Sequence, residues 1–297
     1  MAYWARRGSR QLACSDGVEG KEYDLISAHW PPFSPDSRHM GYVAKRDGKK
    51  FPVMDGAEEE AYDDVSGPTF SPDSRSVTYY VVRGGKYRLV VSPVGGTASE
   101  ATLGKEYDGI GWRFFSPDSR RAISTARLAG KWFVVLDGEE GKAAEEITDE
   151  IRFSPDSNRF AYVMKRGGKY LAVADGVEGV EYDAVSYLKF SPDSKRVTYA
   201  AMRNQKHFVV TDAVEGKECD WIGIPLFTAD SAHAITWGKR DRREFFVIDG
   251  VDQTEYDHTG GYGVTADSRH IAYCAKRNGQ GFVVVDGVEG YYYYGYR

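Results

Sequence analysis

Short continuous runs of apolar residues recur along the chain and are separated by turn-forming residues. Examples are Phe133–Leu136, Phe245–Ile248 and Phe282–Val285. A continuous apolar run, rather than an alternating one, is typical of a strand that is covered on both faces. No segment of useful length shows the period of about 3.6 residues that marks an amphipathic helix. The pattern therefore predicts an all-β protein.

Each apolar run belongs to a longer repeat that is marked by Ser-Pro-Asp-Ser or a close relative of it. The tetrapeptide recurs seven times, with its aspartates at Asp36, Asp73, Asp118, Asp156, Asp193, Asp230 and Asp267. Successive aspartates are 37, 45, 38, 37, 37 and 37 residues apart. A nearly fixed period in this range indicates stacked copies of one supersecondary unit.

One copy, from Tyr187 to Asp220, divides into four short segments of strand-forming residues. Tyr187–Phe190 leads into the Ser-Pro-Asp-Ser turn, in which proline presets the backbone angle. Arg196–Met202 and His207–Thr211 follow, joined by a turn that is Arg-Gly-Gly or Arg-Asp-Gly in other copies, and Lys217–Asp220 ends the unit. Four antiparallel strands per unit, with each sheet sandwiched between two neighbours, predict the blades of a β-propeller.

The number of blades depends on how the ends of the chain are counted. The second strand of the unit occurs eight times, beginning near Ala2, Met40, Val77, Ala122, Phe160, Val197, Ala234 and Ile271. The first strand occurs only seven times. We therefore expect eight blades, the first lacking its inner strand unless Tyr291–Arg297 helps to fill it; seven full blades with an appended hairpin are the alternative. We expect residues 1–297 to form one closed domain, because an open ring would expose strand edges.

The repeat also resembles that of a known family. Phe-Ser-Pro-Asp-Ser-Arg, an Ala-Tyr-Val-type strand, a Gly-Gly turn and Phe-Val-Val-Val-Asp-Gly together resemble the WD-like repeats of TolB-type β-propellers. The resemblance covers essentially the whole chain and implies a β-propeller fold. It says little about function, because the family serves widely as a binding platform and as a partner domain of enzymes.

Composition narrows the classes of partner. Hydrophobic residues make up 41 % of the chain, enough for a packed core. Charged residues make up 28 %, a fraction that does not suggest a disordered chain. The net charge of -5 argues against nucleic acid as a partner, since phosphate binding needs a clustered basic field.

No apolar run approaches the roughly 20 residues that span a bilayer. As written, the N-terminus lacks a signal region, so we expect a cytoplasmic monomer, or a periplasmic or secreted protein if a leader has been lost. The cysteines, Cys14, Cys219 and Cys274, are predicted to be buried thiols.

Acidic and basic residues repeat in register with the strands. The Ser-Pro-Asp-Ser and Asp-Gly aspartates are predicted to stabilise tight turns. A second set of acids ends the fourth strand: Asp24, Asp63, Asp108, Asp149, Asp183, Asp220 and Asp257. Arginines end the second strand at the same face: Arg7, Arg46, Arg83, Arg127, Arg166, Arg203, Arg240 and Arg277. We expect ion pairs between these two sets. An anion-binding rim is the alternative, with Arg46 and Arg166 as ligand-binding candidates.

The copies differ most in the loops that lead into the first strand. Three positions before its phenylalanine, or the equivalent residue, stand Trp30, Gly67, Trp112, Glu150, Tyr187, Ile224 and Gly261, with His29, Trp221, His258 and Tyr262 nearby. Aromatic and imidazole side chains around a channel suit stacking on sugars or peptide side chains. The predicted ligand-binding residues are therefore Trp30, Trp112, Tyr187, Trp221, His258 and Tyr262. The same side chains could instead pack between blades or plug the channel.

No catalytic motif, phosphate-binding glycine loop or paired zinc-ligand spacing occurs in the sequence. We therefore expect a non-enzymatic binding or scaffold propeller for a protein, peptide or glycan ligand, without a cofactor or metal. An enzyme with its site at the channel mouth is the alternative, in which His29, Glu150 and His258 would act together. A regulatory propeller separated from a hydrolase domain is a third possibility.

Overall fold

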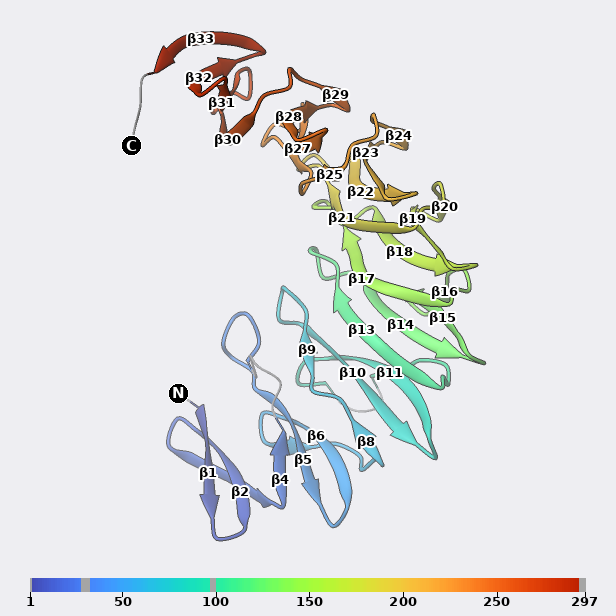
Figure 1. Ribbon diagram of the computed structural model, residues 1–297. Coiled ribbons are helices and arrows are strands. Elements are labelled where there is room, and N and C mark those ends of the chain that lie inside the picture. The colour runs from blue at the N-terminus through green and yellow to red at the C-terminus, as the bar shows by residue number, and fades with distance from the viewer. Residues whose placement is uncertain (1, 28–32, 97–99, 294–297) are drawn as a thin grey trace. The chain divides into compact units, whose positions relative to one another are not determined.

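The structure, a computed structural model, describes residues 2–27, 33–96 and 100–293. Within them the chain is all-β and forms eight antiparallel sheets, as the sequence predicted (Figure 1). The part of the chain that the structure describes contains no apolar helix of membrane-spanning length. The chain divides into two compact units, Met1–Ala144 and Glu145–Arg297.

The first unit contains four sheets. They consist of β1 (Ala2–Arg7), β2 (Arg10–Ser15) and β3 (Val18–Tyr23); of β4 (Leu25–Ser27), β5 (Gly41–Arg46), β6 (Lys49–Met54) and β7 (Ala57–Glu58); of β8 (Asp64–Val65), β9 (Thr69–Phe70), β10 (Ser76–Arg83), β11 (Lys86–Pro93) and β12 (Thr102–Leu103); and of β13 (Gly109–Phe115), β14 (Ala122–Leu128), β15 (Lys131–Leu136) and β16 (Glu139–Glu140). In each sheet the strands lie side by side in chain order, apart from β8 and β9, which both pair with β10.

The second unit repeats this arrangement in four more sheets. They consist of β17 (Glu146–Phe153), β18 (Phe160–Arg166), β19 (Lys169–Ala174) and β20 (Val177–Glu178); of β21 (Ala184–Phe190), β22 (Val197–Arg203), β23 (Lys206–Thr211) and β24 (Val214–Glu215); of β25 (Trp221–Ile222), β26 (Leu226–Phe227), β27 (Ala234–Arg240), β28 (Arg243–Ile248) and β29 (Val251–Asp252); and of β30 (His258–Val264), β31 (Ile271–Arg277), β32 (Gln280–Val285) and β33 (Val288–Tyr293). Strands β25 and β26 both pair with β27.

The ends of the repeat follow the sequence prediction in part. The first sheet has three strands and lacks the inner one, as expected. Tyr291–Tyr293 belong to β33, the outer strand of the last sheet, where Tyr293 lies opposite Gly281. Residues 294–297 lie outside the described part, so the filling of the first sheet by the C-terminal segment stays a prediction. One closed domain over 1–297 stays a prediction.

The repeated aspartates stabilise turns, as their positions predicted. In the Ser-Pro-Asp-Ser turn that follows β21, Ser191 Oγ donates to Asp193 Oδ1 at 2.6 Å and the backbone N–H of Lys195 donates to the same oxygen at 3.1 Å. The turn also binds its neighbour, because the backbone N–H of Asp193 donates to Ser231 Oγ of the next repeat at 2.8 Å. The equivalent bond joins Asp36 to Ser74 in the first unit.

The hydrophobic core lies between the sheets. In the second unit one cluster joins strands of two neighbouring sheets, with Val163, Tyr182, Leu188 and Tyr199 all buried. Both faces of such strands are covered, which is why their sequences read as continuous apolar runs.

Two of the three cysteines are buried as predicted, and one is not. Cys14 and Cys219 are buried, and burial raises the pKa of Cys219 to about 11. The prediction was wrong for Cys274, which is exposed in β31.

Candidate binding surface at the interrupted first strands

The first strand of a sheet is interrupted at the same register in six of the described sheets. In β13, β17, β21 and β30 the interruption is a β-bulge, between residues 110 and 113, 147 and 151, 186 and 189, and 259 and 262. In the two remaining sheets it splits the strand into β8 and β9 and into β25 and β26. Bulges redirect side chains and often lie next to functional sites.

These interruptions coincide with the residues that differ between copies. Gly67, Trp112, Glu150, Tyr187, Ile224 and Gly261 all lie at them. Trp30 and His29 lie outside the described residues. Comparison of the copies identified this position as variable. It did not predict that the first strand is interrupted there, because the six interruptions share no residue type at this position.

Trp112 and Tyr187 are the most prominent aromatic residues at the bulges. The exposed fractions of these residues are 58 % and 42 %. The backbone N–H of Trp112 donates to Thr125 Oγ1 at 3.0 Å, and that of Tyr187 donates to Glu150 Oε1 at 2.8 Å. Side chains of the neighbouring strand or sheet therefore hold both bulges in place, while the rings remain accessible.

Tyr187 has an unusual backbone conformation. Its φ angle is +61°, in the left-handed region that bulky residues rarely adopt. The other non-glycine residues with positive φ in the described part are turn residues such as Asp175, Ser194 and Asn204. Tyr187 is the only aromatic among them. Such a conformation costs of order 1 kcal/mol and persists only when surrounding structure imposes it.

Trp221 and Tyr262 are half-exposed and packed on one side. The Trp221 ring lies 4.3 Å from that of Trp237, and Tyr262 makes an edge contact with Phe246 at 5.6 Å between ring centroids. Each keeps about two fifths of its surface exposed. One face of each ring thus packs on a neighbouring strand and the other is open, while binding of a ligand by these residues stays a prediction.

His258 and Glu150 are each bound to other residues. His258 Nδ1 lies 2.8 Å from Glu244 Oε2, while Glu150 accepts a bond from Arg152 at 2.9 Å besides that of Tyr187. No hydrogen bond or ion pair joins His258 to Glu150 in this part of the chain. Nor do three His, Cys, Asp or Glu side chains of the described residues lie close enough to share a metal ion.

The arginines that end the second strands are bound within the repeat. Arg46 donates two bonds to Glu58, at 2.9 and 3.0 Å, and its guanidinium lies 5.0 Å from the ring centroid of Phe51. Arg166 binds Glu178 through two bonds of 2.9 Å. These arginines therefore hold fourth strands in place, and the structure gives neither of them a free guanidinium.

The predicted pairing of these arginines with the aspartates that end the fourth strand was wrong. Asp220 instead binds Lys206 at 2.6 Å and accepts the backbone N–H of Asp241, in the next sheet's hairpin, at 2.9 Å. The same pattern holds for Asp183, which binds Lys169 and the N–H of Asn204. The reason is register, because the glutamate of the short fourth strand lies nearer to the arginine than the aspartate that follows it.

Glu58 makes stability depend on pH. Its bonds from Arg46, supported by one from Tyr23 and opposed by burial, lower the pKa of the Glu58 carboxyl from its ordinary value of 4.5 to about 2. The folded state therefore gains stability above pH 4.5 and loses it as the pH falls toward 2. Urea denaturation at pH 5 and at pH 3 measures the free energy of unfolding at each pH. We expect this free energy to fall less between pH 5 and pH 3 in Glu58→Gln than in the unaltered protein. Equal losses in the two proteins would contradict this assignment.

Comparison with known proteins finds only solved structures of low similarity. No protein-family model matches the chain, and neither does any curated protein. Similar solved structures include TolB from Acinetobacter baumannii (15% identity, TM-score 0.33, covering 80% of this chain and 64% of that one). The β-propeller domain of the trilobed protease from Pyrococcus furiosus shares 12% identity at a TM-score of 0.35, covering 97% of this chain and 94% of that one. A prolyl endopeptidase shares 11% identity at a TM-score of 0.41, covering 93% of this chain.

The chain spans 64% of the TolB chain and 54% of the prolyl endopeptidase chain. The structures found thus include TolB proteins and another β-propeller domain, the family that the repeat resembles. The similarity carries no information on a ligand.

Proposed function

We propose that this protein is a non-enzymatic binding propeller, and that its ligand, a protein, a peptide or a glycan, contacts the side chains at the interrupted first strands. The observation that carries the proposal is Tyr187. Tyr187 is half-exposed and has a strained backbone conformation, which glycine would adopt without strain. Fold stability alone therefore does not explain a tyrosine at this position. Strained residues of this kind are concentrated at ligand-binding sites.

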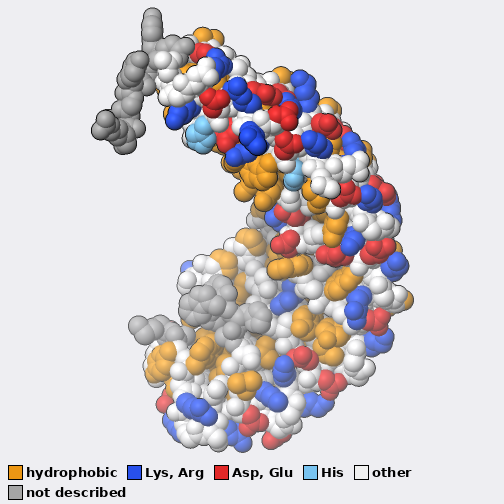
Figure 2. Space-filling model, viewed as in Figure 1, with side chains coloured by type: hydrophobic (Ala, Val, Ile, Leu, Met, Phe, Trp, Pro, Cys, Tyr) orange, Lys and Arg blue, Asp and Glu red, His pale blue; other side chains and the backbone are white. Residues whose placement is uncertain are grey.

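The neighbouring residues fit the same role. In the second unit Ile224 and Trp221 are exposed by 48 % and 41 % at the next interruption, and Tyr262 by 40 % at the one after it. Figure 2 shows hydrophobic side chains, in orange, gathered at several places on the visible face. Trp112 supplies a similar group in the first unit. Rigid aromatic side chains gain contact area at little cost in conformational entropy. Arg46 and Arg166, being bound to glutamates, would act by supporting the sheets rather than by touching the ligand.

The test is a thermal-shift screen of peptides and glycans, followed by calorimetric titration of any hit. Tyr187→Gly is expected to weaken binding about tenfold or more, the loss typical of an aromatic residue at the centre of an interface. The same change should leave the free energy of unfolding unaltered or raise it by up to about 1 kcal/mol, because it relieves the strained φ angle.

Val214→Ala is the matched control. Val214 is 71 % exposed, more than Tyr187, but it is the first residue of β24, away from the interrupted first strands. Its substitution should change neither binding nor stability. Unaltered ligand affinity in Tyr187→Gly, or a large fall in its melting temperature, would refute the proposal.

A further inference from the structure

An arginine of the first unit stands where neighbouring copies have a core residue. Arg113 lies at the bulge of β13, directly after the exposed Trp112. Counted from the turn aspartates, its place in the repeat is that of Ile151 and Leu188 in the next two copies. Both of those residues are buried, and Leu188 belongs to the cluster that joins two sheets. The sequence therefore places a charged side chain at a position that other copies fill with an apolar one.

The guanidinium of Arg113 has partners for only part of its donors. Nη2 donates to the backbone carbonyl of Gly67, in the break between β8 and β9, at 2.5 Å. The guanidinium also lies 5.4 Å from the ring centroid of Tyr80. Nε is buried, and no group of the described residues accepts a hydrogen bond from it. Burial lowers the pKa of the guanidinium from its ordinary value. A buried donor without an acceptor costs free energy, and so does a buried charge without a counter-charge.

The chain supplies no carboxylate to Arg113. None of the described aspartates and glutamates forms an ion pair or a hydrogen bond with it. Acidic side chains are absent from the rest of the sequence, which is residues 1, 28–32, 97–99 and 294–297. Burial raises the pKa of Tyr80 and so does the charge of Asp64, while Arg113 lowers it, but Asp64 itself binds Lys50 at 2.5 Å. The Arg113 guanidinium is thus without a counter-charge in this fold.

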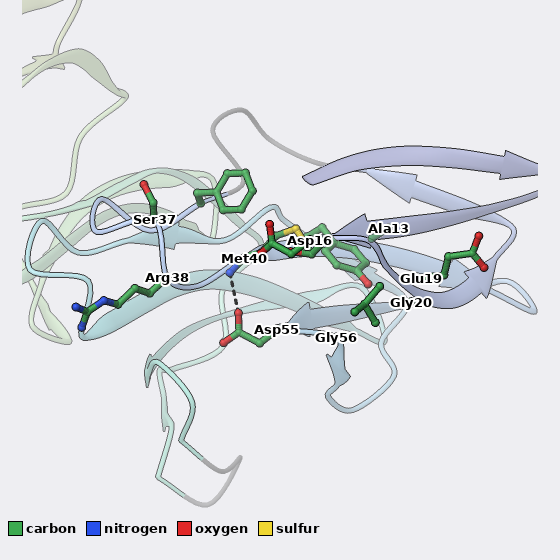
Figure 3. A pocket seen from close by; sticks show the side chains of 13 residues that line it. Ala13, Asp16, Glu19, Gly20, Ser37, Arg38, Met40, Asp55 and Gly56 are labelled. Carbon is green, nitrogen blue, oxygen red and sulfur yellow. Dashed lines mark hydrogen bonds between the residues drawn. The ribbon is translucent and has the colours of Figure 1, made fainter. Parts of the chain in front are cut away.

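The cavity of the first unit has the opposite charge. It measures about 290 Å³ and lies between the first two sheets (Figure 3). Asp16, Glu19 and Asp55 line it, and Arg38 is the one cationic residue among those that do. Such a lining repels anions. An anionic group that approaches this unit is therefore attracted to the bulge of β13 rather than to the cavity.

We propose that Arg113 binds a carboxylate of a peptide or protein ligand, and that Trp112 contacts an apolar group beside that carboxylate. The inference rests on the proposed function, since it names the chemistry that one of the interrupted strands recognises. A carboxylate accepts two bonds from a planar guanidinium and supplies its counter-charge.

Two other anions fit less well. A phosphate group carries about two negative charges, but the neighbouring cation, Lys50, is already bound to Asp64. A sugar acid needs partners for its hydroxyl groups, whereas the contacts of Arg113 are a ring and one backbone carbonyl. The single charge of a carboxylate therefore matches the single guanidinium.

Nuclear magnetic resonance titration with Nα-acetyl-glutamate α-amide tests the proposal. The Nε–H group of Arg113 and the indole N–H of Trp112 each give a side-chain signal, and the probe should shift both. It should bind about tenfold more tightly than Nα-acetyl-glutamine α-amide, which has the same shape without the charge. N-acetylglycine carries its carboxylate at the end of the chain, so tighter binding of this second probe assigns the site to a C-terminus instead of an acidic side chain.

Arg113→Leu introduces the residue found at position 188 and should abolish the preference for the acidic probe. Because it removes a buried charge without a counter-charge, the melting temperature should stay the same or rise. Arg166→Leu is the matched control. Its arginine already has a carboxylate partner in Glu178, so this variant should keep the preference.

Several outcomes would overturn the inference. They are equal affinity for the glutamate and glutamine probes, tighter binding of inorganic phosphate or glucuronate, and an unaltered preference or a lower melting temperature in Arg113→Leu. The proposed function is tested separately by Tyr187→Gly. A peptide ligand that is lost in Tyr187→Gly but bound normally by Arg113→Leu would refute this inference alone. Probe binding at Arg113, with unaltered ligand affinity in Tyr187→Gly, would refute the role of Tyr187 alone.

Discussion

Replacing Leu188 by alanine is expected to lower the free energy of unfolding by about 2–4 kcal/mol. Leu188 follows Tyr187 inside the bulge of β21, yet it is 1 % exposed and belongs to the cluster that joins two sheets of the second unit. Truncation removes apolar contacts and leaves a cavity. The surrounding strands cannot move in to fill it, because hydrogen bonds within each sheet hold them in place. Urea denaturation followed by tryptophan fluorescence measures the loss.

Tyr187→Ala provides the comparison. Because its ring is accessible, its truncation should change the free energy of unfolding by less than about 1 kcal/mol. At this bulge, Leu188 is thus buried in the core while Tyr187, the residue before it, is exposed. Similar losses from both substitutions would show that Tyr187 belongs to the core and would leave the proposed binding surface without its central residue.

Replacing Glu215 by alanine is expected to lower the free energy of unfolding by about 1–2 kcal/mol. Glu215 accepts two bonds from Arg203, at 3.1 and 2.8 Å, and one from the Tyr182 hydroxyl at 2.7 Å. Tyr182 is buried and belongs to the preceding sheet. Without the carboxylate, a guanidinium stacked between the rings of Tyr182 and Phe208 and a buried hydroxyl both lose their partner.

A double-mutant cycle separates the two losses. Tyr182→Phe removes the hydroxyl and keeps the ring, so it should cost about 1 kcal/mol alone and less when Glu215 is already alanine. Additive effects would mean that the hydroxyl and the carboxylate do not interact in solution. In that case the contact between sheets would rest on apolar packing alone.

The repeat allowed the fold to be predicted from the sequence, because turn chemistry and apolar runs are local signals. The positions of Asp193 and its equivalents specify tight turns whatever surrounds them. The partners of the arginines could not be predicted in the same way. Whether Arg203 meets Glu215 or Asp220 depends on the pairing of the two-residue strand β24, which the local sequence does not specify.

The candidate binding surface was predicted in part. Comparison of the copies identified the position of Trp112 and Tyr187 as variable, and both are exposed. The strain at Tyr187 could not be predicted, since tyrosine is not a residue that marks a left-handed conformation.

The bond between successive Ser-Pro-Asp-Ser turns has an evolutionary consequence. Asp36 binds Ser74 and Asp193 binds Ser231 through the same two groups, a backbone N–H and a serine hydroxyl. Any copy can therefore follow any other without a new junction having to arise. Duplicated copies would therefore share this junction from the start, and substitutions at the bulges could accumulate without altering it.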